Sequence, residues 1–256
     1  MGRMSGKVAL ISGGAEGIGA TVGRMFVEEG GSVMLGDLQL DKAQALADEL
    51  GDNAAAVSLD VRDLDAWNAA VDATVDKFGK LTSLCNIAGI SEPGNTIDVD
   101  LDSWNRHIDI NLNGTFYGCR AALPPMEKAG EPGTIVNVGS MLAARAGANM
   151  AAYCASKAGV THLTRSVALD CAARDIPVRA NTVHPGAIRT PMYERYLNAG
   201  GATPDEIEMA MASAHPVGRV GEPEEVAKAI LFLSSDESSF TSGADLTVDG
   251  ASTIRE

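Results

Sequence analysis

The amino-acid sequence predicts one α/β domain in which helices cover both faces of a parallel, doubly wound β-sheet. Short apolar runs alternate with longer helical patterns from end to end, and no charged or Pro/Gly-rich linker divides the 256 residues. A glycine-rich turn also joins the first apolar run to the first helical pattern. Because a chain of this length can bury a large core by itself, we expect a single domain over residues 1–256.

The predicted strands are short and rich in β-branched residues, which suits strands that are covered on both faces. They span residues 8–12, 32–36, 55–59, 81–86, 134–138, 179–183 and 246–248. The first predicted helix carries an apolar stripe at i, i+4, i+7 and i+8, formed by Ile18, Val22, Met25 and Phe26. Residues 43–50 and 67–78 repeat that pattern. Strands and helices in alternation imply right-handed crossovers and therefore a parallel sheet.

Residues 191–216 break this alternation. They follow the sixth predicted strand and mix large apolar side chains such as Met192 and Met211 with Gly200, Gly201 and Pro204. We expect a substrate lid, because long connections in compact domains often cover binding sites and this one starts at the carboxyl edge of the sheet, where ligands bind. An amphipathic helical hairpin that completes the core or an oligomer contact is the alternative.

The charge balance excludes one class of partner. The chain has 34 acidic and 20 basic residues, a net charge of −14, and its isoelectric point is about 4.6. Proteins that bind nucleic acid rely on clustered Lys and Arg, so a nucleic-acid partner is not expected. A nucleotide cofactor is still compatible, because backbone amides and a helix N-terminus can hold small phosphates.

Cysteine and histidine usage indicates neither disulfides nor a metal. Cys85, Cys119, Cys154 and Cys171 form no close pair, which is typical of reduced thiols in a cytoplasmic protein. The four histidines, His107, His162, His184 and His215, do not have the spacing of metal ligands, and His184 is expected to be a loop or core residue. No signal peptide and no stretch of about 18 apolar residues is present, so we expect no membrane segment and a cytoplasmic location.

The segment from Ser12 to Gly19 has the features of a phosphate-binding turn. Gly13 would let the chain leave the strand in a conformation closed to other residues, Gly17 would let the backbone approach a pyrophosphate, and Gly19 would allow close helix–strand packing. The following helix N-terminus offers amides and partial positive charge. The spacing departs from G-x-G-x-x-G, but its position between a strand and an amphipathic helix indicates a dinucleotide site.

Asp37 stands at the end of the second predicted strand. A carboxylate there would accept hydrogen bonds from both hydroxyls of the adenosine ribose and repel a 2′-phosphate, and the next residues are Leu38, Gln39 and Leu40 rather than Arg or Lys. This favours NAD over NADP. A helix-capping role for Asp37 is the alternative. Asp60 and Val61, after the third strand, would lie beside the adenine by the same topology.

Tyr153 and Lys157 are four residues apart in a long helical pattern, which places them on one helix face. A phenol titrates near pH 10, and a neighbouring ammonium is expected to lower that value. A tyrosine tuned in this way could transfer the proton that accompanies hydride transfer. Such a pair is common on ordinary helices, so the spacing alone favours a solvated helix face.

Taken together, these residues resemble the short-chain dehydrogenase/reductase family in its NAD-dependent form. The resemblance covers essentially the whole chain and rests on the Ser12–Gly19 turn, Asp37, Asp60-Val61, Asn86-Ile87-Ala88-Gly89, Asn111, Ser140, Tyr153, Lys157, Pro185-Gly186 and Thr190. Two positions depart from the family pattern. Ser12 replaces a threonine and keeps its hydroxyl, whereas Ile87 replaces an asparagine and loses an amide.

The resemblance implies a role for each of four polar residues. Tyr153 would be the general acid/base, and Lys157 would bind the nicotinamide ribose and lower the tyrosine pKa. Ser140 would hydrogen-bond the substrate oxygen, and Asn111 would hold a water in a proton relay. The positions fit these roles, since Ser140 ends an apolar strand and Asn111 lies in a helical stretch where an amide can act against a loosened carbonyl.

The resemblance also implies the cofactor site, the strand order and the assembly. The fold would be of the Rossmann type with order 3-2-1-4-5-6-7, and the protein would be a homotetramer built on the helices that carry Asn111 and Tyr153. The implied cofactor-binding residues are Ser12, Gly13, Glu16, Gly17, Ile18, Gly19, Asp37, Leu38, Asp60, Val61, Asn86, Ala88, Gly89, Tyr153, Lys157, Pro185, Gly186, Ile188 and Thr190.

The expected reaction is the reversible oxidation of a secondary alcohol to a ketone with NAD. Aliphatic, cyclic and steroid alcohols are the expected substrates, since the segments between Ser140 and Tyr153 are mostly small or apolar. Met141 and Leu142 would line the substrate side, with core packing as an equal explanation. The alternative functions are a 3-oxoacyl thioester reductase and a nucleotide-sensing protein that kept the fold without the chemistry.

Overall fold

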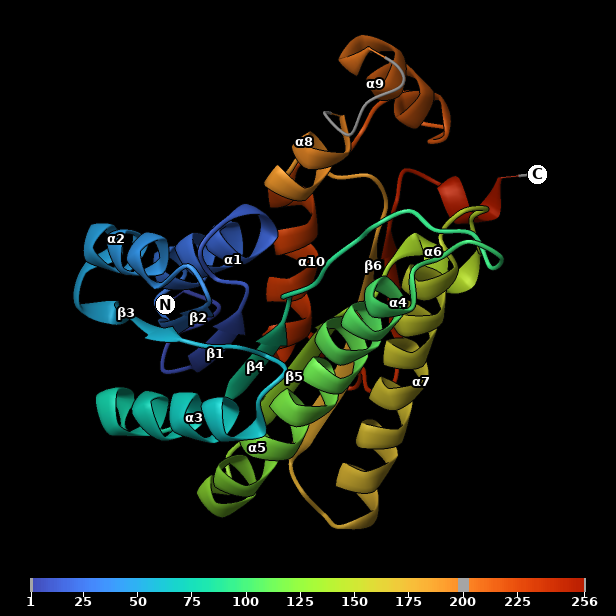
Figure 1. Ribbon diagram of the computed structural model, residues 1–256. Coiled ribbons are helices and arrows are strands. Elements are labelled where there is room, and N and C mark those ends of the chain that lie inside the picture. The colour runs from blue at the N-terminus through green and yellow to red at the C-terminus, as the bar shows by residue number, and fades with distance from the viewer. Residues whose placement is uncertain (1, 198–202, 256) are drawn as a thin grey trace.

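A computed structural model describes residues 2–197 and 203–255. Within them, seven parallel strands form one sheet in the order β3-β2-β1-β4-β5-β6-β7, which confirms the predicted fold class and strand order (Figure 1). The strands are β1 Val8–Ser12, β2 Ser32–Asp37, β3 Ala54–Ser58, β4 Ser83–Asn86, β5 Gly133–Val138, β6 Val178–Pro185 and β7 Asp245–Val248.

Helices occupy the connections between these strands. They are α1 Gly17–Glu28, α2 Leu40–Leu50, α3 Leu64–Phe78, α4 Leu101–His107, α5 Gly114–Ala129, α6 Met141–Ala144, α7 Ala151–Ala173, α8 Pro191–Leu197, α9 Pro204–Ser213 and α10 Pro223–Ser234. A π-helical turn, Ile108–Asn113, joins α4 to α5. Short 3-10 turns cover Gly51–Asn53, Asp236–Ser238 and Ser252–Ile254.

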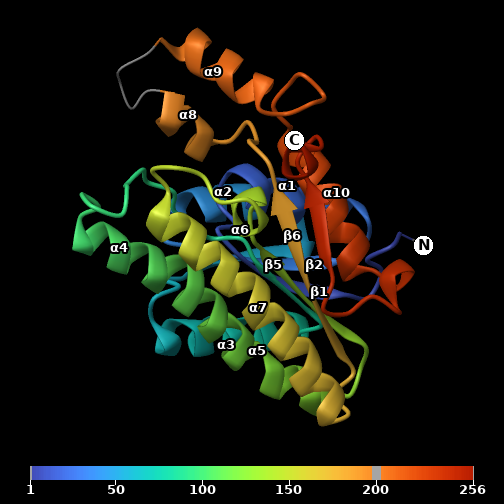
Figure 2. The ribbon, with the colours of Figure 1, turned by 90° about the vertical axis from the view of Figure 1, so that its right-hand side faces the viewer.

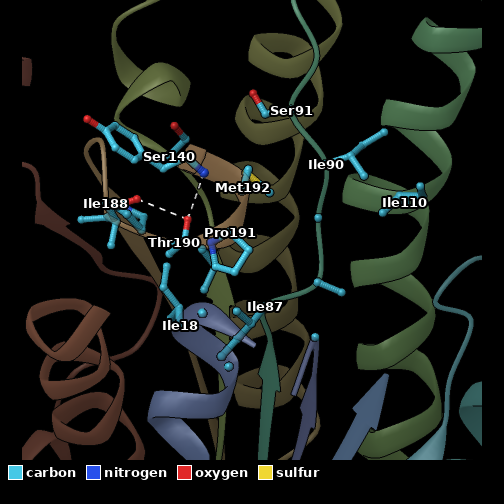
Figure 3. Close-up of a pocket in the computed structure, with 18 of the residues that line it drawn as sticks. Ile18, Ile87, Ile90, Ser91, Ile110, Ser140, Ile188, Thr190, Pro191 and Met192 are labelled. Carbon is cyan, nitrogen blue, oxygen red and sulfur yellow. Dashed lines mark hydrogen bonds between the residues drawn. The ribbon is translucent and has the colours of Figure 1, made fainter. Parts of the chain in front are cut away.

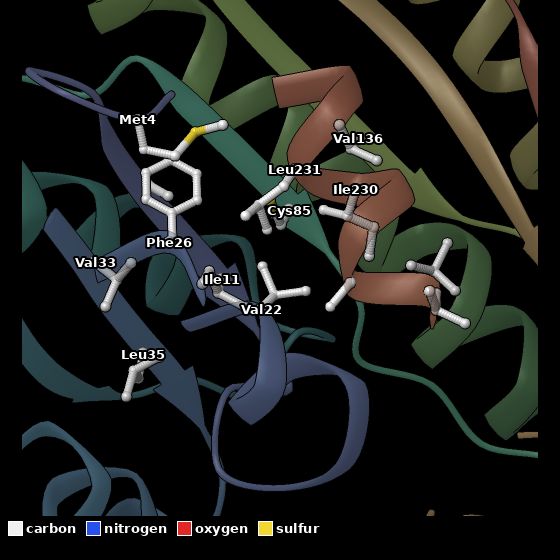
Figure 4. Packing of buried hydrophobic residues seen from close by; sticks show 14 of the residues in the cluster. Met4, Ile11, Val22, Phe26, Val33, Leu35, Cys85, Val136, Ile230 and Leu231 are labelled. Atoms are coloured by element: carbon white, nitrogen blue, oxygen red, sulfur yellow. The ribbon is translucent and has the colours of Figure 1, made fainter. Parts of the chain in front are cut away.

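The sheet lies between two helical layers (Figure 2). Helices α1, α2 and α10 cover one face, where Phe26 packs in a fully buried cluster with Ile11, Val33 and Ile230 (Figure 4). Helices α3, α5 and α7 cover the other face around the fully buried Trp67. The predicted stripe on the first helix has this origin, because Val22 and Phe26 face the sheet. Burial on both faces is also why the strands are apolar without alternation.

Strand ends differ from the predicted ranges by one or two residues. The fourth strand was expected to start at residue 81, but the ladder starts at Ser83. Leu81 is buried in the core at 1% exposure without pairing in the ladder, so its apolar character reflects packing rather than strand pairing. The sixth strand is longer than predicted because it pairs with both β5 and β7, as far as Pro185.

The connection predicted over residues 191–216 forms helices α8 and α9, which stand beyond the carboxyl edge of the sheet (Figure 1). A capping box at Thr203 and Glu206 starts α9. Residues 198–202 of the proposed lid lie outside the described residues. No helix in the described part of the chain is long and apolar enough to cross a membrane.

Candidate active site

A cavity of about 690 Å³ opens at the carboxyl edge of the sheet. Figure 3 shows Ile18, Ile87, Ile110, Ser140 and Ile188 around it, each from a different segment of the chain. The structure brings 18 of the predicted site residues to this cavity: Gly13, Glu16, Gly17, Ile18, Gly19, Asp37, Leu38, Asp60, Val61, Ala88, Gly89, Ser140, Tyr153, Lys157, Pro185, Gly186, Ile188 and Thr190. Ser12, Asn86 and Asn111 lie behind its walls.

The glycine turn has the backbone that the sequence predicts. Gly13 and Gly17 have φ of +71° and +56°, a region that L side chains rarely adopt. A Cβ atom at Gly19 would lie 2.0 Å from the carbonyl oxygen of Gly13, so only glycine lets the helix start this close to the strand end. The free amides at the start of α1 therefore face the cavity, in the arrangement that binds phosphates.

Asp37 is held by backbone rather than acting as a helix cap. Its Oδ2 accepts from the Ala15 amide at 3.1 Å and its Oδ1 from the Gln39 amide at 2.9 Å. The N-cap position of α2 is Gln39, so the alternative of Asp37 as a cap is wrong. Each carboxylate oxygen keeps a further lone pair that could accept from a ribose hydroxyl.

Basic residues that sequence reasoning missed lie beside the acidic residues of the cavity. Glu16 pairs with Lys42 at 3.1 Å and with Arg195 at 3.5 Å. Burial raises the pKa of Glu16, but hydrogen bonds and charge from these cations leave it below its ordinary value. The Arg62 guanidinium donates hydrogen bonds to both carboxylate oxygens of Asp60 and lowers the pKa of that carboxyl. Arg195 is 179 residues from Glu16, so no local pattern could reveal this pairing.

Ser12 and Asn86 support the cavity floor from behind. The Ser12 hydroxyl accepts from the amides of Ile87 and Ala88 at 3.1 and 3.3 Å, which joins the glycine turn to the end of β4. Asn86 donates to the Asn137 side chain at 2.8 Å and is 4% exposed. Its Oδ1 finds no hydrogen-bond partner among the described residues. The structure therefore gives both side chains a supporting position behind the cavity, and their predicted contact with the cofactor stays a prediction.

Ser140, Tyr153 and Lys157 converge at the cavity wall from the end of β5 and the first turns of α7. The Lys157 ammonium donates to the Val138 carbonyl at 2.8 Å and lies 5.9 Å from the centre of the Tyr153 ring. Ser140 is 6% exposed and its hydroxyl accepts from the Leu142 amide at 3.1 Å, which caps α6. Side chains from two elements thus meet as the resemblance implies.

The pKa of Tyr153 shifts in the direction opposite to the sequence prediction. Burial raises it, while a hydrogen bond with Ser140 acts in the other direction. Burial also lowers the pKa of Lys157 to about 8. Removing water disfavours the charged form of both groups, which explains both directions. Burial dominates the shift of the phenol, so the separate effect of the Lys157 ammonium on the pKa of Tyr153 stays a prediction.

Asn111 lies in the π-helical turn and is fully buried. Its side chain accepts from the Ile90 amide at 2.9 Å and donates to the Ile90 carbonyl at 3.0 Å and to the Ser156 hydroxyl at 3.0 Å. Its own carbonyl accepts from the Thr115 hydroxyl at 2.7 Å. The loosened helical stretch predicted around Asn111 is present, and the amide itself ties the loop at residue 90 to α7.

The loop after β6 forms another wall. The Gly186 amide donates to the Val248 carbonyl at 2.9 Å, and the Thr190 hydroxyl donates to the Ile188 carbonyl at 3.2 Å (Figure 3). The Tyr193 amide donates to the Thr190 hydroxyl at 3.3 Å, which joins this loop to α8. His184, at the end of β6, is buried at 4% exposure and is a core residue, as predicted.

Apolar side chains dominate the remaining wall. Met141 and Leu142 line the cavity, which favours the substrate-side interpretation over core packing. The predicted lid contributes Met192, Tyr193, Tyr196 and Met211 to the cavity, and Met150 comes from the segment expected on the substrate side. Ile90, Ser91 and Ile110 are cavity residues that the sequence prediction left out. Among the described residues, no cluster of three or more His, Cys, Asp or Glu side chains could hold a metal ion.

The fold and this site together define a dehydrogenase/reductase with a dinucleotide site at the carboxyl edge of the sheet. A family model described as enoyl-(acyl carrier protein) reductase matches residues 13–253. The chain belongs to the short-chain dehydrogenase/reductase family, whose members use a nicotinamide cofactor.

Curated relatives match nearly the whole chain. A trans-4-hydroxycyclohexanecarboxylate dehydrogenase from Sinomonas cyclohexanicum is 41% identical and the match covers 98% of this chain and 94% of that protein. A 3-alpha-(or 20-beta)-hydroxysteroid dehydrogenase from Mycobacterium tuberculosis is also 41% identical, with 97% and 90% covered. An NADP-dependent (R)-specific alcohol dehydrogenase from Lentilactobacillus kefiri is 36% identical, with 99% of each chain covered.

A solved structure agrees with the fold over its full length. The 3-ketoacyl-(acyl-carrier-protein) reductase from Brucella melitensis, in complex with NADH, has a TM-score of 0.89 and is 32% identical. The match covers 98% of this chain and 100% of that one.

Proposed function

We propose that this protein is an NAD-dependent oxidoreductase that interconverts a secondary alcohol and its ketone. The observation that carries the proposal is the convergence of Ser140, Tyr153 and Lys157 on one cavity, which also reaches Asp37 and the glycine turn. Bound NAD would accept or return the hydride. The residues fit this cofactor, because the positive-φ glycines leave room for a pyrophosphate beside the start of α1.

In the proposed mechanism, side chains of this chain orient the alcohol and move its proton. The Ser140 hydroxyl would hold the substrate oxygen, and the Tyr153 hydroxyl would take the carbinol proton during oxidation. Lys157 would hold the nicotinamide ribose, and its positive charge would stabilise the phenolate. At neutral pH most Lys157 side chains carry the charge, because the pKa is about 8. Asn111 would support the relay by keeping the loop at residue 90 in register with α7.

We propose an uncharged alicyclic, aliphatic or steroid alcohol as the substrate. The cavity lining includes the apolar side chains of Met141, Leu142, Met150, Met192 and Met211. Methionine side chains adapt to irregular apolar shapes, so this lining suits bulky ring systems of varied outline. Two relatives at 41% identity are named for a hydroxycyclohexane acid and for hydroxysteroids, which supports the same class.

Replacing Tyr153 by Phe tests the mechanism and the non-catalytic alternative together. The variant removes only the hydroxyl, so we expect kcat to fall by about 10²–10⁴-fold, the usual contribution of a general acid/base. The dissociation constant for NADH, measured by fluorescence, should stay within about twofold of the wild-type value, since the nucleotide contacts remain. Wild-type turnover in this variant contradicts the mechanism. A wild-type protein that binds NADH but oxidises no alcohol in a broad panel supports the nucleotide-sensing alternative.

We further propose NAD rather than NADP, on the basis of Asp37 and Glu16. Both carboxylates line the cavity, and a 2′-phosphate beside Asp37 would be repelled. Lys42 and Arg195 are paired with Glu16, which limits their attraction for a phosphate. Comparing kcat/KM for NAD and NADP in the wild type and in Asp37→Ala tests this: the variant should lose much of the discrimination. A wild-type preference for NADP would overturn the assignment.

The same alcohol panel should include a 3-oxoacyl thioester, in the reductive direction. A structural neighbour is named for a 3-ketoacyl carrier-protein reductase, so this is the second candidate function. Higher kcat/KM for the thioester than for every cyclic or steroid ketone would establish it.

Domain organisation and assembly complete the proposal. We infer a single domain over residues 1–256, a substrate lid formed by the described parts of 191–216, a cytoplasmic location, and a homotetramer in contact through α5 and α7. Supporting observations are that Met192 and Met211, on α8 and α9, line the cavity, and that the four cysteines, all within the described residues, are free thiols. Phe116 and Leu169 leave large apolar side chains exposed on α5 and α7.

A further inference from the structure

His215 links the helix α9 to the loop that follows β6. Its side chain is 3% exposed, and it lies two residues after the end of α9. The Ala187 amide donates to its Nε2 at 3.0 Å, and its Nδ1 lies 2.7 Å from the Met211 carbonyl oxygen. One buried imidazole therefore contacts the loop that follows β6 on one side and the last turn of α9 on the other.

These two partners determine the state of the ring. A backbone amide can only donate and a backbone carbonyl can only accept. Nε2 must therefore carry a lone pair and Nδ1 must carry the proton, which defines the neutral Nδ1–H tautomer. No other protonation state makes both bonds, because the Nε2–H tautomer and the imidazolium would each direct a hydrogen at the Ala187 amide.

Packing around the ring is equally specific. A Cβ atom at Gly186 would lie only 2.5 Å from Nε2 of His215 and 2.9 Å from the Cα atom of Asp249, so a glycine is required where the loop passes the imidazole. The loop is also held at Gly186 by the Val248 carbonyl, and at the Ala187 carbonyl by the Gly221 amide. The Ala187 amide has its acceptor in His215 alone among the described residues.

Residues at both ends of this link line the cavity. Met211, whose carbonyl holds Nδ1 of His215, also lines the cavity on the substrate side. Gly186, Ala187 and Ile188 line the same cavity on the side proposed for the nicotinamide. A shift of the ring would thus move two walls of the site at once.

We propose that His215 is a positioning residue that sets the loop 186–190 for the nicotinamide and joins it to the substrate wall on α9. It acts through the Ala187 amide and does not touch the reacting atoms. The proposal rests on the proposed function only for the identity of the ligand, since the link itself is a property of the folded chain.

Two substitutions each remove one of the two hydrogen bonds of the His215 ring and keep the other. In His215→Gln, the amide oxygen is three bonds from Cβ, as Nε2 is, so the acceptor for Ala187 is kept while the donor to Met211 is lost. In His215→Asn, the amide nitrogen is two bonds from Cβ, as Nδ1 is, so the donor to Met211 is kept while the acceptor is lost. The variants are matched in polarity and differ in which neighbour they hold.

The measurements are the dissociation constant for NADH by fluorescence, kcat and KM for the best alcohol, and hydrogen exchange of the Ala187 amide. We expect His215→Gln to stay within about twofold of the wild type for NADH. His215→Asn should weaken NADH binding by about tenfold and speed exchange at Ala187, because that buried amide loses its acceptor. Equal effects of the two variants, or no effect of His215→Asn at all, would overturn the proposal.

A measurement on the wild type covers the case in which a variant does not fold. The ¹⁵N chemical shifts of the His215 ring should show a protonated Nδ1 and an unprotonated Nε2 near neutral pH, and the other tautomer or an imidazolium would overturn the proposal. If the wild type binds no NADH, the proposed function fails, whereas the tautomer and the exchange at Ala187 still decide whether His215 holds the loop.

Discussion

At the residue scale, the site holds two ionisable side chains, Lys157 and Tyr153, whose charged forms are disfavoured by burial. Lys157 is 5% exposed, and its ammonium hydrogen-bonds a neutral carbonyl rather than a carboxylate. Tyr153 beside it has a pKa raised by burial. A bound substrate or ribose would change the surroundings of both groups and therefore their pKa values.

Lys157 gives a pH dependence of stability whose sign follows from its lowered pKa. The unfolded chain holds this proton up to about pH 10.5 and the folded chain only to about 8, so the unfolded state binds more protons in between. Stability should therefore rise with pH across that window, by about 2 kcal/mol between pH 7 and 9.5. Lys157→Met should lack this rise. Guanidinium unfolding of both proteins at pH 7, 8, 9 and 9.5 measures it, and parallel curves would contradict it.

At the scale of the elements, side-chain caps determine where helices begin near the site. Asp63 has an extended backbone and its carboxylate accepts from the Asp65 amide at 2.9 Å, which starts α3 directly after the Asp60-Val61 pair. Gly79 ends the same helix with φ of +82°. The π-helical turn at Ile108–Asn113 is a further device, because it places Asn111 against both the loop at residue 90 and α7.

The cap of α3 can be tested with a matched pair on one helix. Asp63→Ala leaves the first-turn amides without their acceptor and should lower the free energy of unfolding by about 1 kcal/mol. Asp72→Ala, at an exposed position in the middle of α3, removes the same charge without touching a cap and should change it by less than about 0.5 kcal/mol. Urea titration of both variants measures the difference. Equal losses would mean that charge, rather than the cap, is responsible.

At the scale of the whole molecule, large apolar side chains interrupt a strongly acidic surface. The net charge is −14, yet Leu169 on α7 is 72% exposed and Phe116 on α5 is 43% exposed. The two helices lie side by side in one helical layer that covers the sheet (Figure 2). Burying such residues between copies would stabilise an assembly through these helices.

A charge placed on that face should break the proposed assembly. Wild-type protein should sediment at four times the 26.5 kDa chain mass. Leu169→Asp should reduce the assembly to smaller species, because a carboxylate would be buried without a partner. Asp170→Asn, at the neighbouring exposed position on α7, changes one charge without adding a carboxylate and serves as the control. Monomeric wild type at micromolar concentration would refute the tetramer.

Much of the fold and of the site was predictable because the signals are local or periodic. Strands covered on both faces need continuous apolar runs, so β1 was predicted with its observed bounds and the others to within one or two residues. The glycines of the first turn indicate a backbone conformation that other residues rarely adopt. Residues that reach the cavity from the ends of strands, such as Asp37 and Ser140, follow from the topology once the strands are assigned.

The rest depended on contacts between distant segments. The sequence by itself determined the parallel sheet, the glycine turn and the polar residues gathered at the carboxyl edge, since each depends on periodicity or on a motif within a few residues, and the strand order followed from the family resemblance. Only the tertiary structure decided that Asn86 lies behind the cavity, that Arg195 pairs with Glu16, that burial raises the pKa of Tyr153, and that His215 holds Ala187. These properties arise from desolvation and from neighbours brought together by folding, which no local pattern records.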